Sequence, residues 1–332
     1  MPESHLHALL TTSAVALLPD ATYLRVTGSD RVRWLNGMAT NSIQSLAPDQ
    51  GNYNFFLNAQ GRIQGDATIW NRGDSFDLIT SCTRRSELLA KLDHFIIMDD
   101  VEITPAPDDF HILLLAGPTA PALLEQIGFP RESLETRNPL SSLHLTTFAL
   151  HPHPPVPLVH AHSPLVPRFE FWGDLATLNQ ITRRLLEAGA ARASAADLEQ
   201  LRILEGTPLF GTDIRDRDLP QETAQTRALH FAKGCYLGQE IVERIRSRGN
   251  VHRTFSGFLL TGEIPPAGTA LTSEEKAVGE LTSVSRIELP TGIIQLGLGY
   301  IRREAIERKK DGSQPIQYPN GAATPIPLPY RP

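Results

Sequence analysis

Short apolar runs alternate with amphipathic stretches along the first 210 residues of the chain. Runs rich in β-branched and aromatic residues predict strands at 22–26, 53–57, 63–70, 75–80, 101–104, 111–116 and 170–172. Apolar residues three and four positions apart predict helices at 30–35, 84–98, 175–188 and 194–205, with a further helix after Gly117-Pro118. Strands that alternate with helices at this spacing are typical of an α+β fold with mixed or antiparallel sheets.

Several boundaries of these predicted elements carry capping or turn residues. Ser29 is expected to cap the helix at 30–35, and Asp174 is expected to cap the helix at 175–188. The Asn- and Gly-containing residues 58–62 separate two strand-like runs, so they predict a β-hairpin. Residues 228–231 are expected to form a further short strand.

The character of the sequence changes at about residue 254. From there onward Gly and Pro recur between short apolar runs, which favours a small β-barrel or sandwich. We therefore expect a first region over residues 1–250 and a C-terminal β-barrel over residues 251–332. The first region is expected to hold two intertwined α+β subdomains, the second centred on about 105–190. The Pro-rich residues 309–332 are expected to wrap the barrel as an extended tail.

Composition narrows the classes of function. The 332-residue chain can bury a large core, and its formal net charge of −6 argues against a general nucleic-acid binder. Two cysteines exclude a disulfide framework, and they are too few to hold an iron–sulfur cluster or a thiolate zinc site alone. The pairs His151/His153 and His160/His162 have strand-like spacing. Their Pro-rich setting, without an acidic residue nearby, favours loop or edge positions, so no metal site is expected.

No segment suggests export, a membrane span or a nucleotide cofactor. No Lys or Arg precedes Arg25, which fits neither a secretory signal nor an Arg-rich transit peptide. No apolar run approaches the ~20 residues that span a bilayer. No phosphate-loop or dinucleotide fingerprint is present, so flavin, nicotinamide and ATP are not expected. We expect a soluble protein of a reducing cytoplasm with no membrane partner.

The densest group of reactive residues is the stretch Lys233-Gly234-Cys235-Tyr236-Leu237-Gly238-Gln239-Glu240. A thiol two residues from an ammonium, on a glycine-bracketed turn, is a candidate for a lowered thiol pKa, because nearby positive charge stabilises the thiolate. Residues 239–244 predict a helix, and the dipole at its N-terminus would also favour an anion. The alternative is a buried structural cysteine beside a tight turn.

This octapeptide resembles the signature of the YgfZ family, Lys-Gly-Cys-Phe/Tyr-x-Gly-Gln-Glu, with Leu237 at the variable place. That family comprises folate-binding proteins related to T-protein, the aminomethyltransferase of the glycine cleavage system. Residues 34–41 and 219–222 resemble further segments of the same family. The resemblance implies a T-protein-like folate-binding fold with mixed or antiparallel sheets and a C-terminal β-barrel.

The resemblance also implies a ligand, tetrahydrofolate or a one-carbon derivative. Residues 61–66 resemble a T-protein hairpin in which an acidic residue serves the chemistry on the folate, and Asp66 is the carboxylate that remains of the family's pair. The alternative for Asp66 is a solvated strand residue. Residues 201–206 resemble a segment whose Glu hydrogen-bonds the pterin. Glu205 suits that role, because a carboxylate accepts two parallel N–H bonds from a 2-amino-pyrimidinone edge.

These likenesses define the candidate site. The candidate catalytic residues are Cys235, Lys233 and Asp66. The candidate folate-binding residues are Asp66, Glu205, Tyr236, Gln239 and Arg248. Arg248 belongs to a basic stretch that also contains Arg244, Arg246, His252 and Arg253. This stretch could clamp the carboxylates of a folate glutamate tail, or it could be an ordinary solvated surface.

The resemblance implies an accessory protein that supports assembly or repair of iron–sulfur enzymes, some of them tRNA-modifying. Its partners would be folate and iron–sulfur client proteins, without direct nucleic-acid binding. Because one motif thiol cannot hold a cluster, a transient role of Cys235 is expected. One alternative is a glycine-cleavage-type aminomethyltransferase, although T-proteins have Asp and Arg where this chain has Cys235 and Gln239. The other is a non-catalytic folate-binding module in which Cys235 is only structural.

Overall fold

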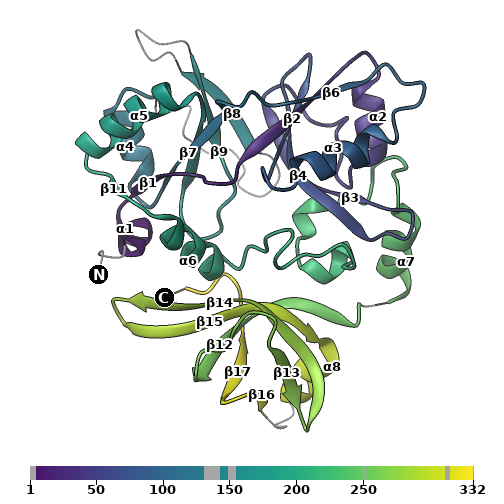
Figure 1. The fold of residues 1–332 in the computed structure, drawn as a ribbon, viewed down its shortest axis with the longest axis vertical. Coiled ribbons are helices and arrows are strands. Elements are labelled where there is room, and N and C mark those ends of the chain that lie inside the picture. The colour runs from purple at the N-terminus through teal and green to yellow at the C-terminus, as the bar shows by residue number, and fades with distance from the viewer. Residues whose placement is uncertain (1–4, 131–142, 149–154, 250, 311–314, 332) are drawn as a thin grey trace. The chain divides into compact units, whose positions relative to one another are not determined.

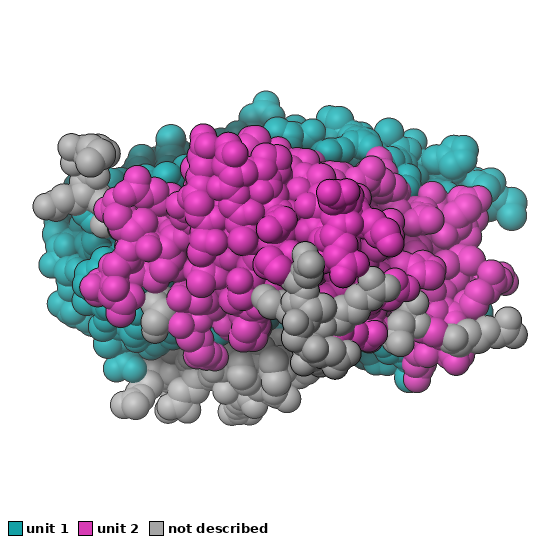
Figure 2. All heavy atoms as spheres, turned by 90° about the horizontal axis from the view of Figure 1, so that it is seen from below, with its two compact units in different colours: residues 1–57, 64–197, 227–237 teal, residues 58–63, 198–226, 238–332 magenta. Residues whose placement is uncertain are grey.

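The computed structural model describes residues 5–130, 143–148, 155–249, 251–310 and 315–331 (Figure 1). The chain divides into two compact units, which Figure 2 shows in different colours. The first unit comprises residues 1–57, 64–197 and 227–237, and the second comprises residues 58–63, 198–226 and 238–332. Each unit is therefore assembled from segments that lie far apart in the sequence.

The first unit is built on an eleven-stranded sheet of order β11-β1-β7-β10-β9-β8-β3-β4-β5-β2-β6. The strands are β1 (Ala14–Leu17), β2 (Thr22–Thr27), β3 (Gln50–Leu57), β4 (Ile63–Asn71), β5 (Phe76–Thr80), β6 (Glu102–Pro105), β7 (His111–Ala116), β8 (Leu143–Phe148), β9 (Val156–His160), β10 (Arg168–Gly173) and β11 (Ala191–Arg192). β1 pairs with β11 in parallel and with β7 antiparallel, so the sheet is mixed, as predicted. Along β2, buried and half-buried residues alternate, which is the period expected of a sheet with one covered face.

Five helices belong to the described part of this unit: α1 (Leu6–Thr11), α2 (Arg31–Met38), α3 (Arg85–Asp93), α4 (Ala120–Gln126) and α5 (Leu175–Glu187). Two separate apolar cores hold four of them, α2 to α5, to the sheet. Residues of α4 and α5 pack with β7 and β10, whereas residues of α2 and α3 pack with β2, β4 and β5. The predicted cap at Asp174 is confirmed, because its carboxylate accepts the Thr177 N–H at 2.8 Å.

Two predictions near α2 and α3 are wrong. The helix predicted over 84–98 ends at Asp93, and the Trp34 indole N–H donates to the Phe95 carbonyl in the loop that follows, at 3.2 Å. Ser29 does not cap α2, because its hydroxyl donates to Asp100 at 2.7 Å. Both outcomes arise from contacts between α2 and the 94–101 loop, which local periodicity does not report.

The second unit contains a closed barrel of order β12-β15-β14-β13-β16-β17. Its strands are β12 (Arg253–Gly262), β13 (Ala270–Ser273), β14 (Lys276–Leu289), β15 (Gly292–Arg302), β16 (Ile316–Tyr318) and β17 (Gly321–Ile326). Helix α6 (Ala195–Glu205) leads into this unit, which also holds α7 (Gln239–Arg248) and α8 (Arg303–Lys310). The predicted barrel is confirmed, but the extended tail is not. Residues 316–326 supply two barrel strands, because Ile316, Tyr318 and Ala323 fill the barrel core.

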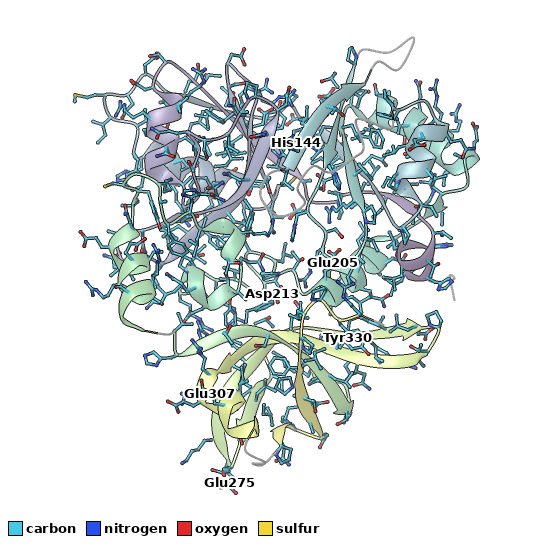
Figure 3. The ribbon with its side chains drawn as sticks, turned by 180° about the vertical axis from the view of Figure 1, so that it is seen from behind. His144, Glu205, Asp213, Glu275, Glu307 and Tyr330 are labelled. Atoms are coloured by element: carbon cyan, nitrogen blue, oxygen red, sulfur yellow. The ribbon has the colours of Figure 1, made fainter. Side chains whose placement is uncertain are left out.

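Asp213, labelled in Figure 3, fastens α6 to the barrel within this unit. Its fully buried carboxylate accepts from the Arg202 guanidinium of α6 at 2.7 Å and from the Leu209 N–H at 2.9 Å. Its other oxygen accepts the hydroxyl protons of Thr282 and Ser283 on β14. Four donors around one buried carboxylate offset the cost of removing the charge from water.

We expect Asp213→Ala to lower the free energy of unfolding by about 3–5 kcal/mol, because Arg202 would lose its buried carboxylate partner and keep only the exposed Glu199, and the donors at Leu209, Thr282 and Ser283 would lose a buried acceptor. Chemical denaturation followed by circular dichroism measures this change. Glu288→Ala is the matched control, since Glu288 is exposed on the same strand as Thr282. The control should change stability by less than about 0.5 kcal/mol. Equal stabilities for the two variants would contradict the anchoring role of Asp213.

Candidate functional site

Residues 233–237 of the Cys-containing signature lie on an irregular loop in the first unit, and residues 238–240 belong to the second unit. Residues 226–228 form a short 3-10 helix and α7 begins at Gln239, as predicted, with no regular element between them. The strand predicted over 228–231 is wrong. Thr40 explains this, because its hydroxyl donates to the Ala228 carbonyl at 2.7 Å and its carbonyl accepts the His230 N–H at 3.2 Å. These bonds tie the backbone to the turn after α2 and not to a sheet ladder.

Lys233 points into that same turn. Its ammonium donates to the backbone carbonyls of Asn36 at 2.7 Å, Ala39 at 2.6 Å and Asn41 at 2.7 Å. The ammonium also lies 5.0 Å from the ring centre of Tyr236, within the range of a cation–π contact. The three N–H bonds of the ammonium are all used, so in this arrangement the nitrogen has no proton-accepting site to offer.

Burial sets the protonation of this lysine. It lowers the pKa of Lys233 to about 7, since the charged form is less well solvated inside the protein than in water. At neutral pH the amine is therefore close to its own titration. Loss of one proton would leave two N–H donors for three carbonyls, so the contacts of the turn depend on the protonation state of Lys233.

Cys235 is exposed, and the buried alternative for this cysteine is wrong. Its neighbours on both sides are anchored while the thiol itself projects outward. Lys233 holds one side, and on the other side Tyr236 is buried and the Leu237 N–H donates to the Gly37 carbonyl at 3.0 Å. A fixed backbone beneath an accessible sulfur suits a residue that meets a partner molecule, because little flexibility is lost on contact.

Asp66 lies on β4 and forms a carboxyl–phenol pair. The Tyr53 hydroxyl donates to its Oδ2 at 2.6 Å, and the Arg227 guanidinium lies 4.3 Å from the centre of the Tyr53 ring. Burial raises the pKa of the Asp66 carboxyl, and the hydrogen bond from Tyr53 and the charges of Arg227 and Arg84 oppose that rise. Asp66 is therefore not a freely solvated strand residue, and its carboxyl is suited to exchanging a proton nearer to neutrality than an ordinary aspartate.

Asn41 connects these two groups within the first unit. Its carbonyl accepts from Lys233, and its side-chain amide donates to the carbonyls of Arg227 at 2.8 Å and Tyr53 at 3.2 Å. The signature lysine and the Asp66 pair thus share one hydrogen-bonded framework. No sequence pattern assigns Tyr53, Asn41 or Arg227 to the site. The one available signal was the motif-like segment 34–41, whose polar end follows a helix and carries both Thr40 and Asn41.

The other predicted folate-binding residues lie in the second unit. Glu205 is the last residue of α6, is 6% exposed and is labelled in Figure 3. Beside it, the Leu204 carbonyl accepts the Tyr330 N–H at 2.8 Å, so the C-terminal segment covers the end of this helix. Gln239 is half-buried as the first residue of α7, and the side chain of Arg248 lies outside what the structure describes.

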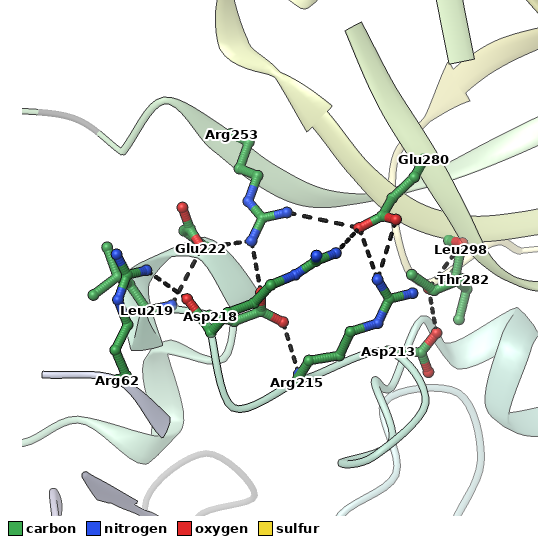
Figure 4. Close-up of polar contacts among 11 residues, drawn as sticks. Arg62, Asp213, Arg215, Asp218, Leu219, Glu222, Arg253, Glu280, Thr282 and Leu298 are labelled. Atoms are coloured by element: carbon green, nitrogen blue, oxygen red, sulfur yellow. Dashed lines mark hydrogen bonds and ion pairs between the residues drawn. The ribbon is translucent and has the colours of Figure 1, made fainter. Parts of the chain in front are cut away.

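The basic stretch is partly neutralised by acidic neighbours of the same unit. The Arg253 guanidinium lies 2.6 Å from Asp218 and 3.1 Å from Glu222, and Figure 4 shows this group continuing through Glu280 to Arg215. Arg253 is therefore committed to internal ion pairs, which removes it from the predicted clamp for a glutamate tail. Arg244 and Arg246 are exposed.

The described histidines do not form a metal site. His151 and His153 lie outside the described residues, and the His160 ring stacks on Phe169 at 4.8 Å. Burial, together with the charges of Arg227 and Arg168, lowers the pKa of His162 to about 4. Across the residues that the structure describes, no three His, Cys, Asp or Glu side chains gather closely enough to hold a metal ion. In the same part of the chain, no helix is both long and apolar enough to cross a bilayer.

The sequence of this chain is similar to two groups of known proteins. Residues 11–152 match the family model described as GCVT N-terminal domain. The chain is 29% identical over 290 residues to a tRNA-modifying protein YgfZ of Yersinia pseudotuberculosis, covering 83% of this chain and 81% of that protein. It is 25% identical over 288 residues to a chloroplastic protein of Arabidopsis thaliana named as a transferase, covering 85% of this chain but only 63% of the plant protein.

The fold itself matches a solved enzyme. The glycine cleavage system aminomethyltransferase T of Bartonella henselae superposes with a TM-score of 0.80 at 19% identity, over 98% of this chain and 88% of that one. At this identity the likeness establishes the architecture, and it confirms the predicted α+β fold with a C-terminal barrel.

The pKa of Lys233 generates a pH prediction. The usual lysine pKa of 10.5 applies to the unfolded chain and about 7 to the folded one, so between these values the unfolded chain binds more protons. The free energy of unfolding should therefore rise with pH across this window in the wild type relative to Lys233→Met. Urea denaturation of both proteins at several pH values from 6 to about 10.5 measures the difference. A difference that stays flat or falls with pH would show that the three carbonyls keep the lysine charged.

Proposed function

We propose that this chain, which belongs to the YgfZ family and has the aminomethyltransferase T fold, is a tetrahydrofolate-binding accessory protein for iron–sulfur enzymes, including tRNA-modifying ones. The observation that carries the proposal is the exposed Cys235 thiol on a loop held by Lys233, in the same unit as the Asp66–Tyr53 pair. In this proposal Cys235 acts on a partner molecule, and the Asp66–Tyr53 pair binds a folate.

The Asp66–Tyr53 pair supports the folate part of the proposal. A reduced pterin carries several ring N–H groups and ring nitrogens, so it needs partners that can both accept and donate hydrogen bonds. A carboxyl with a raised pKa, beside a phenol, can do both. In this proposal Asp66 binds the folate and exchanges a proton with it.

The thiol supports the iron–sulfur part. An exposed sulfur can reach iron, sulfur or a disulfide carried by another protein, which a buried one cannot. A single thiolate is too weak a ligand set to keep a cluster, which takes three or four. Cys235 therefore acts transiently on the client, while Lys233 is a positioning residue that keeps the loop in shape.

Tetrahydrofolate binding tests the first part. We expect the wild-type chain to bind it in a calorimetric titration, and Asp66→Asn to weaken binding by about tenfold, which corresponds to roughly one lost hydrogen bond with a charged or polar partner. Asp108→Asn is the control, since Asp108 is exposed on the turn between β6 and β7. Failure of the wild type to bind any reduced folate would refute this part of the proposal.

The two exposed cysteines provide a matched test of the second part. Cys235→Ala should fold and bind tetrahydrofolate like the wild type, yet fail to restore iron–sulfur-dependent tRNA modification in cells that lack this protein. Cys82→Ala should restore it fully, because Cys82 is also exposed and free but lies outside the signature loop. Modified nucleosides can be measured by mass spectrometry of digested tRNA. Full restoration by Cys235→Ala would leave a folate-binding module with a structural cysteine, and turnover of an aminomethyl-lipoyl carrier would indicate an aminomethyltransferase.

A further inference from the structure

The loop between α3 and β6 carries an apolar tip. Of the large hydrophobic side chains in the described residues, Met98 and Ile97 are the most exposed, at 93% and 84%, and Phe95 is 39% exposed. Single exposed apolar residues are ordinary on protein surfaces, but three within four positions are not. We name residues 95–98 the apolar tip.

Polar contacts hold the two residues that follow the apolar tip. The Arg33 guanidinium lies 2.5 Å from Asp99, and the Asp100 carboxylate accepts the Ser29 N–H at 2.9 Å. The Asp100 N–H in turn donates to Asp30 at 2.9 Å. A loop fixed at its base loses little conformational entropy when its end is bound, so the apolar tip is organised for contact before any partner arrives.

The surroundings of the apolar tip are acidic. The ten residues 93–102 include four carboxylates and no Lys or Arg, and Arg33 of α2 offsets only one of these carboxylates, through its ion pair with Asp99. The acidic residues are Asp93, Asp99, Asp100 and Glu102. Such a rim repels nucleic acid and anionic lipid, and it attracts a protein surface that is basic around an apolar pocket.

One helix joins the apolar tip to the signature loop. The N-terminal half of α2 holds the tip through Arg33 and Trp34, and the C-terminal end of α2 holds the signature through the carbonyls of Asn36 and Gly37. An eight-residue helix is about 12 Å long. A protein seated on the apolar tip would therefore lie within reach of Cys235.

We propose that the apolar tip is the surface on which the iron–sulfur tRNA-modifying client docks. This inference rests on the proposed function and assigns the client its binding surface. An enzyme that binds tRNA presents a basic surface, which complements the acidic rim, while Ile97 and Met98 enter an apolar pocket beside it. Docking at one end of α2 brings the client's cluster site toward the thiol at the other end.

The proposal is tested by binding the full chain to a purified iron–sulfur tRNA-modifying enzyme from the cells that make this protein. Biolayer interferometry measures the affinity. The variant Ile97→Ser/Met98→Ser should weaken binding by about tenfold or more, as expected for a central apolar contact. Ile293→Ser is the matched control, because Ile293 is 55% exposed on the β14–β15 hairpin of the barrel, and it should change affinity less than about twofold.

Asp93→Lys should also weaken binding, and increasing salt should reduce the difference from wild type. The tip variant should keep the melting temperature and the tetrahydrofolate affinity of the wild type.

Unchanged affinity in the tip variant would overturn the docking proposal. So would a wild-type chain that associates through the tip with itself in analytical ultracentrifugation, or with vesicles of phosphatidylcholine and phosphatidylglycerol in a flotation assay. If the tip variant binds and restores tRNA modification normally while Cys235→Ala does not restore it, the docking proposal fails and the proposed function stands. If Cys235→Ala also restores modification, the proposed function fails as well.

Discussion

The contact of one ammonium with three backbone carbonyls organises the first unit around the signature. Asn36 lies in the last turn of α2, and Ala39 and Asn41 follow the helix, so no helical N–H is available to bind their carbonyls. Lys233 supplies the missing donors from nearly 200 residues away, and in doing so it fixes the loop that presents Cys235. In the same segment, the Asn41 side chain donates hydrogen bonds to the carbonyls of Tyr53 and Arg227. The Tyr53 hydroxyl in turn donates to Asp66. The Asp66–Tyr53 pair and the exposed Cys235 are thus both set by one small region of backbone.

The fold could be predicted largely from local pattern. The alternation along β2, the cap at Asp174 and the Gly- and Pro-punctuated barrel strands are all encoded by neighbours in the sequence. The errors share a different cause. The helix predicted to continue to Met98 stops at Asp93 because the following loop is bonded to α2, and residues 228–231 do not form a strand because Thr40 binds their backbone. The apparent tail at 309–332 supplies β16 and β17 because its apolar residues are needed to close a barrel begun sixty residues earlier.

In the candidate site, too, local sequence predicts some features, and contacts between distant residues set the others. Cys235 and Lys233 could be picked out because an unusual motif marks them, and Asp66 because residues 61–66 resemble a T-protein hairpin, but the structure was needed to show how they are held. The spacing of residues in the sequence does not predict the contact of Asn41 with Arg227. The residues around Tyr53 do not predict its hydrogen bond to Asp66. For Arg253, the sequence predicts a binding role that the structure removes. A run of arginines suggests an anion clamp until the acidic partners Asp218 and Glu222, distant in sequence, are seen beside it.

The interleaving of the two units has a consequence for how the chain acquires its structure. Residues 227–237 complete the first unit, yet they are flanked on both sides by segments of the second. During synthesis the sheet of the first unit would emerge long before its final segment, leaving the carbonyls of residues 36–41 hydrated until residue 233 has left the ribosome. Closing a loop of that length carries an entropic penalty that grows only slowly with further separation, but it must be met before the signature takes shape. The reactive loop is thus among the last parts of its unit to become ordered, so a nascent chain would not present its sulfur in the finished geometry until the surrounding scaffold was in place.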